Sequence, residues 1–402
     1  FIWLFFACKL FLFPAKEKAM RTAVMIGSFG SFFNLYQLQA LFPHLEGRFG
    51  TTVVAAGWLN MAALLGMMLT APIIGIITRK AHHSTVLFSG FLILAFFNAL
   101  VAYSNNQCWL FAFRFGQGVV IPFILTSAMS MASVRSASLV PIYVAGTVVG
   151  STFSRAYPAW SVDAVGWEAG FLISACFMLL SALVLLFVSN VDARNFRHTR
   201  ENDKAAIKYL VNAFLESKML IAYTAGFSLL FTQSAIFTTL GLMLSGAPFF
   251  WSSGEIGYIY IACLPALFFV LISRFFRRLI REAMITVLLI FLVWASLFII
   301  GESVVSIFSG VLLFSIGTYV FQTVTGQLLS SSGTVPVRVA TGVYLSFYYC
   351  GGAIGASLAA YAFSVWGWAG VLVCVAVIQA LSVCLVAYLY YGLQRRGKNG
   401  YV

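Results

Sequence analysis

Apolar runs long enough to cross a bilayer recur along almost the whole chain, and they constrain its fold more than any other feature. Each run has about 18 to 25 residues, the length that a helix needs to span the hydrocarbon core. The runs are continuous and do not alternate with polar residues, so they predict helices and not barrel strands. We therefore expect an all-α membrane protein with twelve transmembrane helices. They lie near 22–43, 54–77, 84–104, 108–132, 137–160, 167–189, 218–243, 254–274, 283–300, 303–330, 340–362 and 367–391.

The sequence contains no recognisable pattern of catalytic or metal-binding residues. Of the 402 residues, 61% are apolar and only 9% are charged, too few charges to cover a soluble domain. The seven cysteines form no C-x-x-C pair, and the four histidines lack metal-ligand spacing. There is no phosphate-binding loop and no nucleophile elbow. We therefore expect no catalytic residues, no metal and no cofactor, and we expect that the chain is not an enzyme.

Basic residues are distributed unevenly between the two sides of the membrane. With both termini placed in the cytoplasm, 21 of the 24 Lys and Arg residues fall on the cytoplasmic side and only Arg48 on the outer side. Such a bias marks the cytoplasmic connections of membrane helices. It predicts a multi-pass membrane protein with both termini cytoplasmic, and it explains the net charge of +13 without a nucleic-acid partner. We expect the bacterial inner membrane as its location.

The longest polar connection, residues 190–217, divides the chain into two halves of six predicted helices. We expect it to be a cytoplasmic linker between an N-terminal bundle at 22–189 and a C-terminal bundle at 218–391. Residues 1–21 are expected to form an interfacial or disordered segment, and residues 392–402 a cytoplasmic tail.

The two halves are related by a weak internal repeat, which predicts pseudo-symmetric bundles. In this alignment Gly150 of the fifth predicted helix falls on Gly355 of the eleventh. Arg155 falls on Ala360, so its charge belongs to one half only. A purely architectural arginine would more often be kept in both copies.

This arrangement resembles the major facilitator superfamily of secondary transporters, and three motifs carry the resemblance. The stretch "RFGQGVVIP" at 114–122 is similar to the superfamily's fourth-helix motif, and "GTVVGSTFSR" at 146–155 to its glycine-rich antiporter motif. The stretch "GIITRKAHH" at 75–83 occupies the place of a conformational loop between helices two and three. It keeps Gly75, Arg79 and Lys80, but Thr78 replaces the usual aspartate.

Two further stretches resemble the YnfM-type branch of the drug/proton antiporters. They are "YQLQALFP" at 36–43 and "YLSFYYCGGAIG" at 344–355. The resemblance implies alternating access in the lipid bilayer, with a small-molecule substrate, protons as the coupling ion and a monomeric transporter.

Two arginines, Arg114 and Arg155, lie inside predicted membrane helices, roughly 9 and 8 Å from their outer ends at 1.5 Å per residue. An arginine at the centre of a membrane helix costs at least about 2.5 kcal/mol and normally faces a partner or a cavity. One interpretation pairs the arginines with Glu46, Asp163 or Glu168 near the outer surface. The other places them in an anion-binding cavity, which is favoured by the lack of Asp and Glu deep in the predicted helices.

Further candidates for substrate binding are polar residues on helices expected to line the central path, and their alternative role is to hold helices together by hydrogen bonds or packing. They are Asn34, Gln37, Gln39, Gln117, Gln233, Tyr319 and Gln322. Tyr348 is a further candidate on an aromatic face of the eleventh predicted helix, for which packing is the alternative. Proton coupling has only four weak candidates near the outer side, each of which could equally be a solvated surface group. They are His44, Glu46, Asp163 and Glu168.

The sequence thus favours a secondary active transporter that exports a small organic anion, such as a carboxylate or a siderophore-like compound. One alternative is multidrug efflux of cationic or lipophilic compounds, although such an exporter would be expected to carry a buried Asp or Glu. The other is a transporter-like sensor or scaffold that moves no solute.

Overall fold

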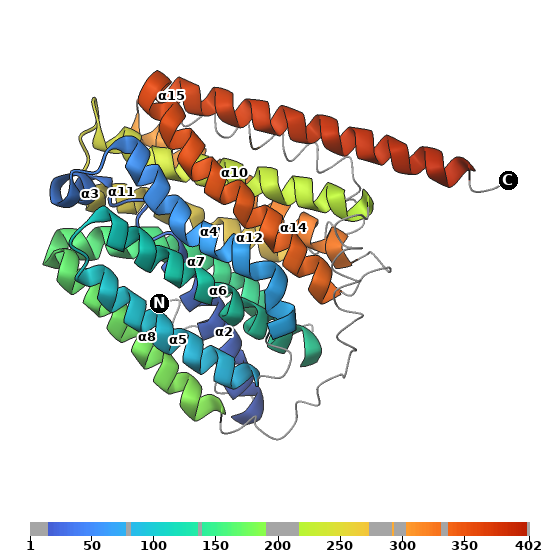
Figure 1. The fold of residues 1–402 in the computed structure, drawn as a ribbon, viewed down its shortest axis with the longest axis horizontal. Coiled ribbons are helices and arrows are strands. Elements are labelled where there is room, and N and C mark those ends of the chain that lie inside the picture. Colours follow the sequence, from blue (N-terminus) through green and yellow to red (C-terminus); the bar gives the residue numbers. More distant parts are fainter. Residues whose placement is uncertain are drawn as a thin grey trace.

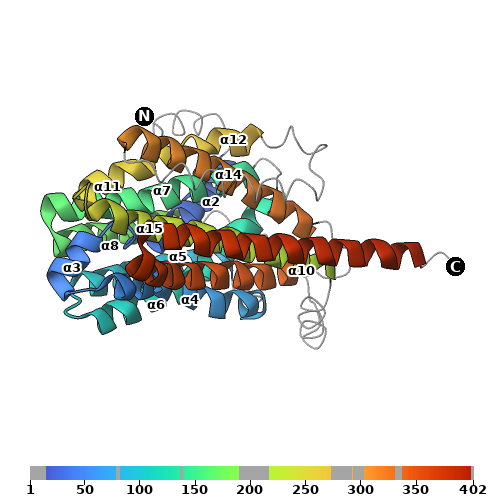
Figure 2. The same cartoon turned by 90° about the horizontal axis from the view of Figure 1, so that it is seen from above.

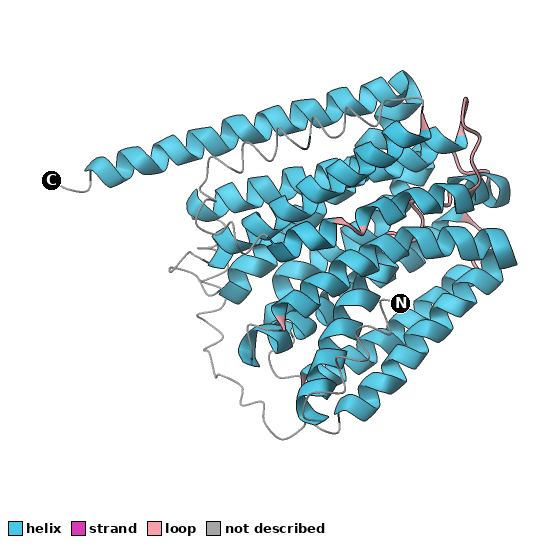
Figure 3. Cartoon of the chain, turned by 180° about the vertical axis from the view of Figure 1, so that it is seen from behind, coloured by secondary structure: helices cyan, strands magenta, loops and turns pink. Residues whose placement is uncertain are grey.

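The computed structural model describes residues 15–77, 82–135, 139–189, 217–272, 292, 303–330 and 337–399. Every element in these ranges is helical, which confirms the predicted all-α fold class (Figure 3). Seven of the described helices are long and apolar enough to cross a membrane. The ninth predicted helix, at 283–300, lies outside the described residues except for Leu292, so the count of twelve stays a prediction.

The described helices follow one another along the chain in the order of their labels. They are α2 (Ala15–Leu35), α3 (Phe42–Phe49), α4 (Val53–Ile77), α5 (His83–Ala102), α6 (Gln107–Arg135), α7 (Val140–Val165), α8 (Trp167–Ser189), α10 (Ser217–Ser245), α11 (Ser253–Ile259), the 3-10 helix η2 (Tyr260–Cys263), α12 (Ala266–Ile272), α14 (Val304–Ser330) and α15 (Val337–Asn399).

Parts of the predicted organisation fall outside these ranges. Gly75 lies near the end of α4, whereas Arg79 and Lys80 are not among the described residues. The same holds for residues 1–14 and for the linker up to residue 216. The boundaries of the predicted domains therefore stay predictions.

The first predicted helix, at 22–43, is wrong in its second half. Helix α2 ends at Leu35, and a turn leads to α3, which begins at Phe42. The backbone N–H of Tyr36 donates a hydrogen bond of 2.7 Å to the hydroxyl of Ser154 on α7, and so it leaves the helical ladder. The turn is thus held by side chains from another helix, which a local apolar pattern does not reveal.

The last two predicted helices, at 340–362 and 367–391, are the two arms of α15. The arms meet at Gly367, whose φ of 62° lies in the left-handed region that favours glycine. Figure 1 shows α15 folding back at this point, with its second arm running to the C-terminus. This arm continues to Asn399, so residues predicted as a tail from 392 onward are helical.

The internal repeat has the same packing role in both halves. A side-chain carbon at Gly150 would overlap the backbone carbonyl of Phe29 on α2. At Gly355 it would overlap the carbonyl of Phe231 on α10. The aligned glycines therefore let two equivalent helix pairs, α7 with α2 and α15 with α10, approach closely.

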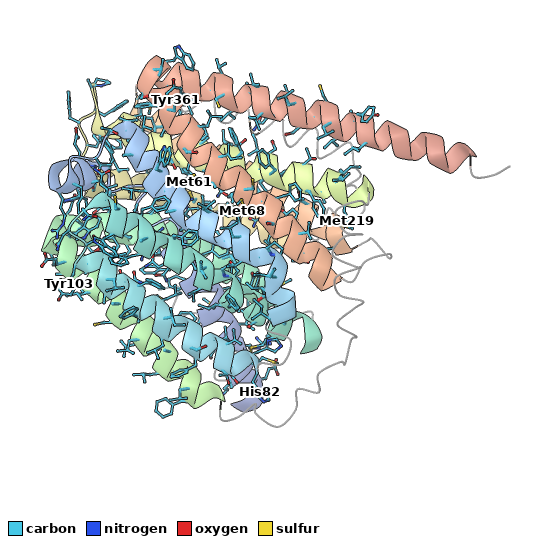
Figure 4. The ribbon with its side chains drawn as sticks, in the orientation of Figure 1. Met61, Met68, His82, Tyr103, Met219 and Tyr361 are labelled. Carbon is cyan, nitrogen blue, oxygen red and sulfur yellow. The ribbon has the colours of Figure 1, made fainter. Side chains whose placement is uncertain are left out.

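Two seams join the N-terminal helices to the C-terminal ones. In the first, α4 runs beside the first arm of α15, where Figure 4 labels Met61 and Met68. Ser346 of α15 donates a hydrogen bond of 2.7 Å to the Met68 carbonyl. In the second, α7 packs against α11 and η2. Figure 2 gives the perpendicular view of both seams.

One end of the bundle carries α3 and the start of α11, and we call it the α3 end. It lies at the left of Figure 1. In Figure 4, Tyr103 marks this end of α5 and His82 marks the opposite end. The residues described next lie between the α3 end and the middle of α7.

The close approach at Gly355 predicts a stability defect on adding one methyl group. We expect Gly355→Ala to lower the free energy of unfolding by about 1–3 kcal/mol, because the methyl overlaps a carbonyl oxygen. The measurement is the thermal unfolding midpoint in detergent. The matched control is Gly47→Ala on α3, where an added carbon would meet nothing within 4 Å. Equal midpoints for the two variants would contradict the packing role.

Candidate functional site

Arg114 is fully buried on α6 and holds the end of α2. Its Nη1 atom donates a hydrogen bond of 2.7 Å to the Asn34 carbonyl, and Nη2 donates to the Leu35 carbonyl. The last carbonyls of a helix have no partner within the helix, and a cation is favourable there. The guanidinium therefore stabilises the point where α2 stops and the turn begins.

Two amide side chains contact Arg114, and two more extend this network from α2 to α5. Nη1 of Arg114 also donates to the side-chain oxygens of Gln37 and Gln117. Asn98 of α5 donates a hydrogen bond of 2.6 Å to Asn34 and accepts one of 3.1 Å from Gln37. Asn98 was not predicted, and its only signal is that it is a lone amide in an apolar run. These contacts are all internal to the N-terminal helices, which favours a structural role for the group.

Arg155 is fully buried on α7 in the second seam. Its Nε atom donates a hydrogen bond of 2.6 Å to the Gln39 side chain, and Nη1 donates one of 2.7 Å to the Ser151 carbonyl. A guanidinium has five N–H donors, and Nη2 has no hydrogen-bond partner among the described residues. Arg155 therefore keeps free donor capacity in a buried place.

Aromatic rings from both sides of the seam contact Arg155. Its Cζ atom lies 4.1 Å from the ring centroid of Tyr36, which follows α2. It lies 4.4 Å from the ring of Phe237 on α10 and 5.6 Å from the ring of Tyr260 on η2. Each such cation–π contact stabilises a cation by about 0.5–2 kcal/mol. No described carboxylate forms an ion pair with Arg155, so the rings carry much of the stabilisation of its charge.

Two polar links cross the same seam. The Ser151 hydroxyl hydrogen-bonds the Tyr319 hydroxyl of α14, with which Gln233 also interacts. Gln39 donates a hydrogen bond of 3.4 Å to Thr238 of α10. Three predicted residues, Gln39, Gln233 and Tyr319, thus lie near Arg155. We call the residues that contact it, with the Tyr319 link, the Arg155 site: Tyr36, Gln39, Ser151, Arg155, Phe237, Tyr260 and Tyr319.

The other predicted residues lie elsewhere. Asn34, Gln37 and Gln117 belong to the Arg114 network. Tyr348 on α15 stacks on Tyr344, with ring centroids 5.8 Å apart, and meets Tyr349 edge-on, with centroids 5.2 Å apart. Gln322 is half-buried on α14, one turn from Tyr319.

Charged residues gather at the α3 end, where Asp163 joins the two halves. One oxygen of Asp163 lies 2.6 Å from His44 Nε2. The other accepts a hydrogen bond of 2.6 Å from the backbone N–H of Gly254 on α11. Trp160 donates to the carbonyl of the same glycine at 3.1 Å. The end of α7 thus holds both backbone groups of Gly254, and we call these contacts the Asp163 clasp.

The predicted pairing of the arginines with surface carboxylates is not formed. Asp163 engages His44, Glu168 pairs with Arg48 at 3.2 Å, and Glu46 is exposed. Helix α7 continues to Val165, so Arg155 lies eight residues, about 12 Å along the helix axis, from Asp163. The arginine is therefore deeper than the predicted helix end at 160 suggested.

The Arg114 contacts predict a loss of stability on truncation. Arg114→Ala leaves the carbonyls of Asn34 and Leu35 buried without their donors, which costs about 1–3 kcal/mol for each group. We expect a clearly lower thermal unfolding midpoint without any ligand present. Arg114→Lys should recover only part of it, because an ammonium lacks the planar fork. An alanine variant as stable as the unmodified protein would contradict the structural role.

Two comparisons of sequence agree on one family. Residues 24–339 match the family model described as Major Facilitator Superfamily. A protein of Buchnera aphidicola subsp. Schizaphis graminum (strain Sg), named "Uncharacterized transporter", is 23% identical over 376 residues, covering 90% of this chain and 89% of the relative. "Uncharacterized MFS-type transporter YybF" of Bacillus subtilis (strain 168) is 21% identical, covering 91% and 92%.

Solved structures show the same fold. A bacterial homolog to the human lysosomal transporter Spinster, in an inward-facing and occupied conformation, has a TM-score of 0.71 at 13% identity, covering 95% of this chain and 98% of that chain. Its inward-facing and unoccupied conformation has a TM-score of 0.68 at 14% identity, covering 94% and 95%. At such identities the likeness concerns the fold alone.

Proposed function

This chain belongs to the major facilitator superfamily of membrane transporters, and from this premise we propose that it exports a small organic anion in exchange for protons. The family and its fold are those of transporters, which are not enzymes. A carboxylate or a siderophore-like compound is the proposed substrate class. The protein is proposed to act as a monomer in the bacterial inner membrane, with both termini in the cytoplasm.

The single observation that carries the proposal is the unpaired charge of Arg155. The guanidinium is fully buried, its Nη2 has no partner among the described residues, and none of their carboxylates pairs with it. A buried cation without a counter-ion is costly, and a bound anion would remove that cost. The fork of an arginine suits a carboxylate, which can accept two parallel hydrogen bonds.

The position of Arg155 also suits alternating access. Its contacts come from helices on both sides of the second seam, so a rocking motion of the halves would change them. Gln39 stays with Arg155, whereas Phe237 and Tyr260 would move away. A ligand at this point would contact both halves and be exposed to each side of the membrane in turn.

Export and proton antiport are supported by the resemblance of residues 146–155 to the antiporter motif and by the YnfM-type stretches. Among the described residues, we propose Asp163 as the group whose protonation changes the contacts between the halves. With the orientation predicted from the basic residues, the clasp closes the outer side. A proton on Asp163 would remove the negative charge that holds both His44 and the Gly254 N–H.

Transport assays in liposomes test the role of Arg155. Arg155→Ala is expected to lower anion affinity by roughly ten- to a hundredfold, the equivalent of one charge-assisted pair of about 1.5–3 kcal/mol. Arg155→Lys should weaken binding several-fold, since it keeps the charge and loses the fork. Uptake of labelled organic anions under a pH gradient is the measurement.

The control is Arg48→Ala, which removes one exposed charge from the same half and should leave transport unchanged. Normal anion flux in Arg155→Ala would refute the anion site. Flux of lipophilic cations instead would favour multidrug efflux. No flux of any solute in a broad panel would favour a sensor or scaffold.

The Asp163 clasp predicts a shift of conformation when its charge is removed. Asp163→Asn keeps the shape of the side chain and mimics the protonated carboxyl, so we expect the α3 end to open more often. Spin labels at the exposed positions Glu46 and Val305, in a chain without its native cysteines, should then show a longer distance component. Glu168→Gln, which removes a charge from the neighbouring surface pair, is the control. An unchanged distance distribution would exclude the clasp as a gate.

A further inference from the structure

We infer that the transported anion carries a single acidic group on a flat aromatic or conjugated body. This inference rests on the proposed function and narrows its substrate class. It starts from the aromatic rings that contact Arg155, because they come from different halves of the protein.

The contacts of Arg155 divide into two groups according to the half that supplies them. Tyr36 and Gln39 belong to the N-terminal half, as does Arg155 itself. The rings of Phe237, at 4.4 Å, and of Tyr260, at 5.6 Å, belong to the C-terminal half. When the halves part along this seam, Arg155 keeps the first group and loses the second.

A ligand that enters between the halves must replace what Arg155 loses. A carboxylate supplies the missing negative charge, and it binds the free edge of the guanidinium. A ring conjugated to that carboxylate lies in the guanidinium plane and extends from the edge of Arg155, where it can pack edge-on or offset against the rings of Tyr36, Phe237 and Tyr260. An aliphatic acid of equal size restores the charge but leaves the π contacts unmade.

The number of acidic groups on the ligand follows from the N–H donors of Arg155 that have no partner. Nε and Nη1 of Arg155 each make one hydrogen bond, which leaves Nη2 and the second N–H of Nη1 as one fork. Arg114, the other fully buried arginine of the described helices, directs Nη1 and Nη2 at acceptors of its own half. Its Nε has no hydrogen-bond partner among the described residues, but a single N–H does not form a fork for a second carboxylate. A second carboxylate on the ligand would therefore be buried without a cation, which disfavours citrate-type polyanions.

Among its described residues, the C-terminal half has no buried arginine enclosed by aromatic rings. This points to a single such site in the protein. The position equivalent to Arg155 is Ala360, whose methyl group packs against Gly57 of α4. Small residues there let the first seam close tightly. Of the two seams, as far as their residues are described, the second carries a fully buried charge covered by rings.

Binding of three probes to the purified full-length protein tests the inference. The probes are benzoate, cyclohexanecarboxylate and citrate, measured by isothermal titration in detergent. Benzoate and cyclohexanecarboxylate have similar size and the same charge, and cyclohexanecarboxylate is the more hydrophobic. We expect benzoate to bind at least tenfold more tightly than cyclohexanecarboxylate, with citrate the weakest, and Arg155→Ala to weaken the binding of all three by roughly ten- to a hundredfold.

A pair of variants tests the source of the preference. Phe237→Leu keeps an apolar side chain without the ring, and it should remove most of the preference for benzoate while cyclohexanecarboxylate binding changes less than twofold. The matched control is Phe314→Leu. Phe314 is a fully buried ring that meets Phe237 edge-on, with centroids 5.4 Å apart, but it is not among the rings that contact Arg155. The preference of the Phe314→Leu variant for benzoate over cyclohexanecarboxylate should be unchanged.

The outcomes separate the two proposals. Equal affinities for benzoate and cyclohexanecarboxylate, both weakened in Arg155→Ala, would overturn the aromatic class and leave anion transport standing. Tightest binding of citrate would overturn the single charge. No binding of any probe, or binding that Arg155→Ala does not change, would overturn both the inference and the proposed anion site. The comparison of probes uses the unmodified protein, so it does not depend on whether a variant folds.

Discussion

The burial of two guanidiniums without carboxylate partners, and of Arg155 above all, is the constraint on which the centre of this protein depends. A charged group in a membrane protein needs compensation, and near Arg155 it comes from three rings, one amide and one carbonyl. These contacts are weaker than an ion pair and involve both halves. They join the two halves in this structure, and in the proposed function an anion would take their place when the halves part.

The two buried arginines show how the same residue type serves different ends. Arg114 directs its donors at the last carbonyls of α2 and at amides of the same half, so it fixes a break in a helix. That break forms the turn on which Tyr36 and Gln39 lie, and both contact Arg155. Arg114 thus stabilises the turn that supplies two of the residues in contact with Arg155.

Most of the fold could be predicted from the sequence, since bilayer length and continuous apolarity mark helices wherever they occur in the chain. Arg155 could be singled out because a charge in such a run is rare, and Gly150 and Gly355 because the repeat aligns them. The end of α2 at Leu35 could not, because it depends on Arg114, far away in the sequence. Phe237 and Tyr260 could not either, because nothing local distinguishes them among 40 phenylalanines and 17 tyrosines.

The two seams between the halves differ in the residues that close them, and the Arg155 site lies in the second seam. The first seam is closed by small residues, with Ala360 against Gly57, and its packing energy is lost without replacement when the helices part. The second seam places a charge and aromatic faces between the helices, and a ligand can cover both. If the proposed anion binds at Arg155, it would lower the free energy needed to open the second seam and leave that of the first unchanged. One differing position in the repeat, Arg155 against Ala360, thus places a buried charge in the second seam and close packing of small residues in the first.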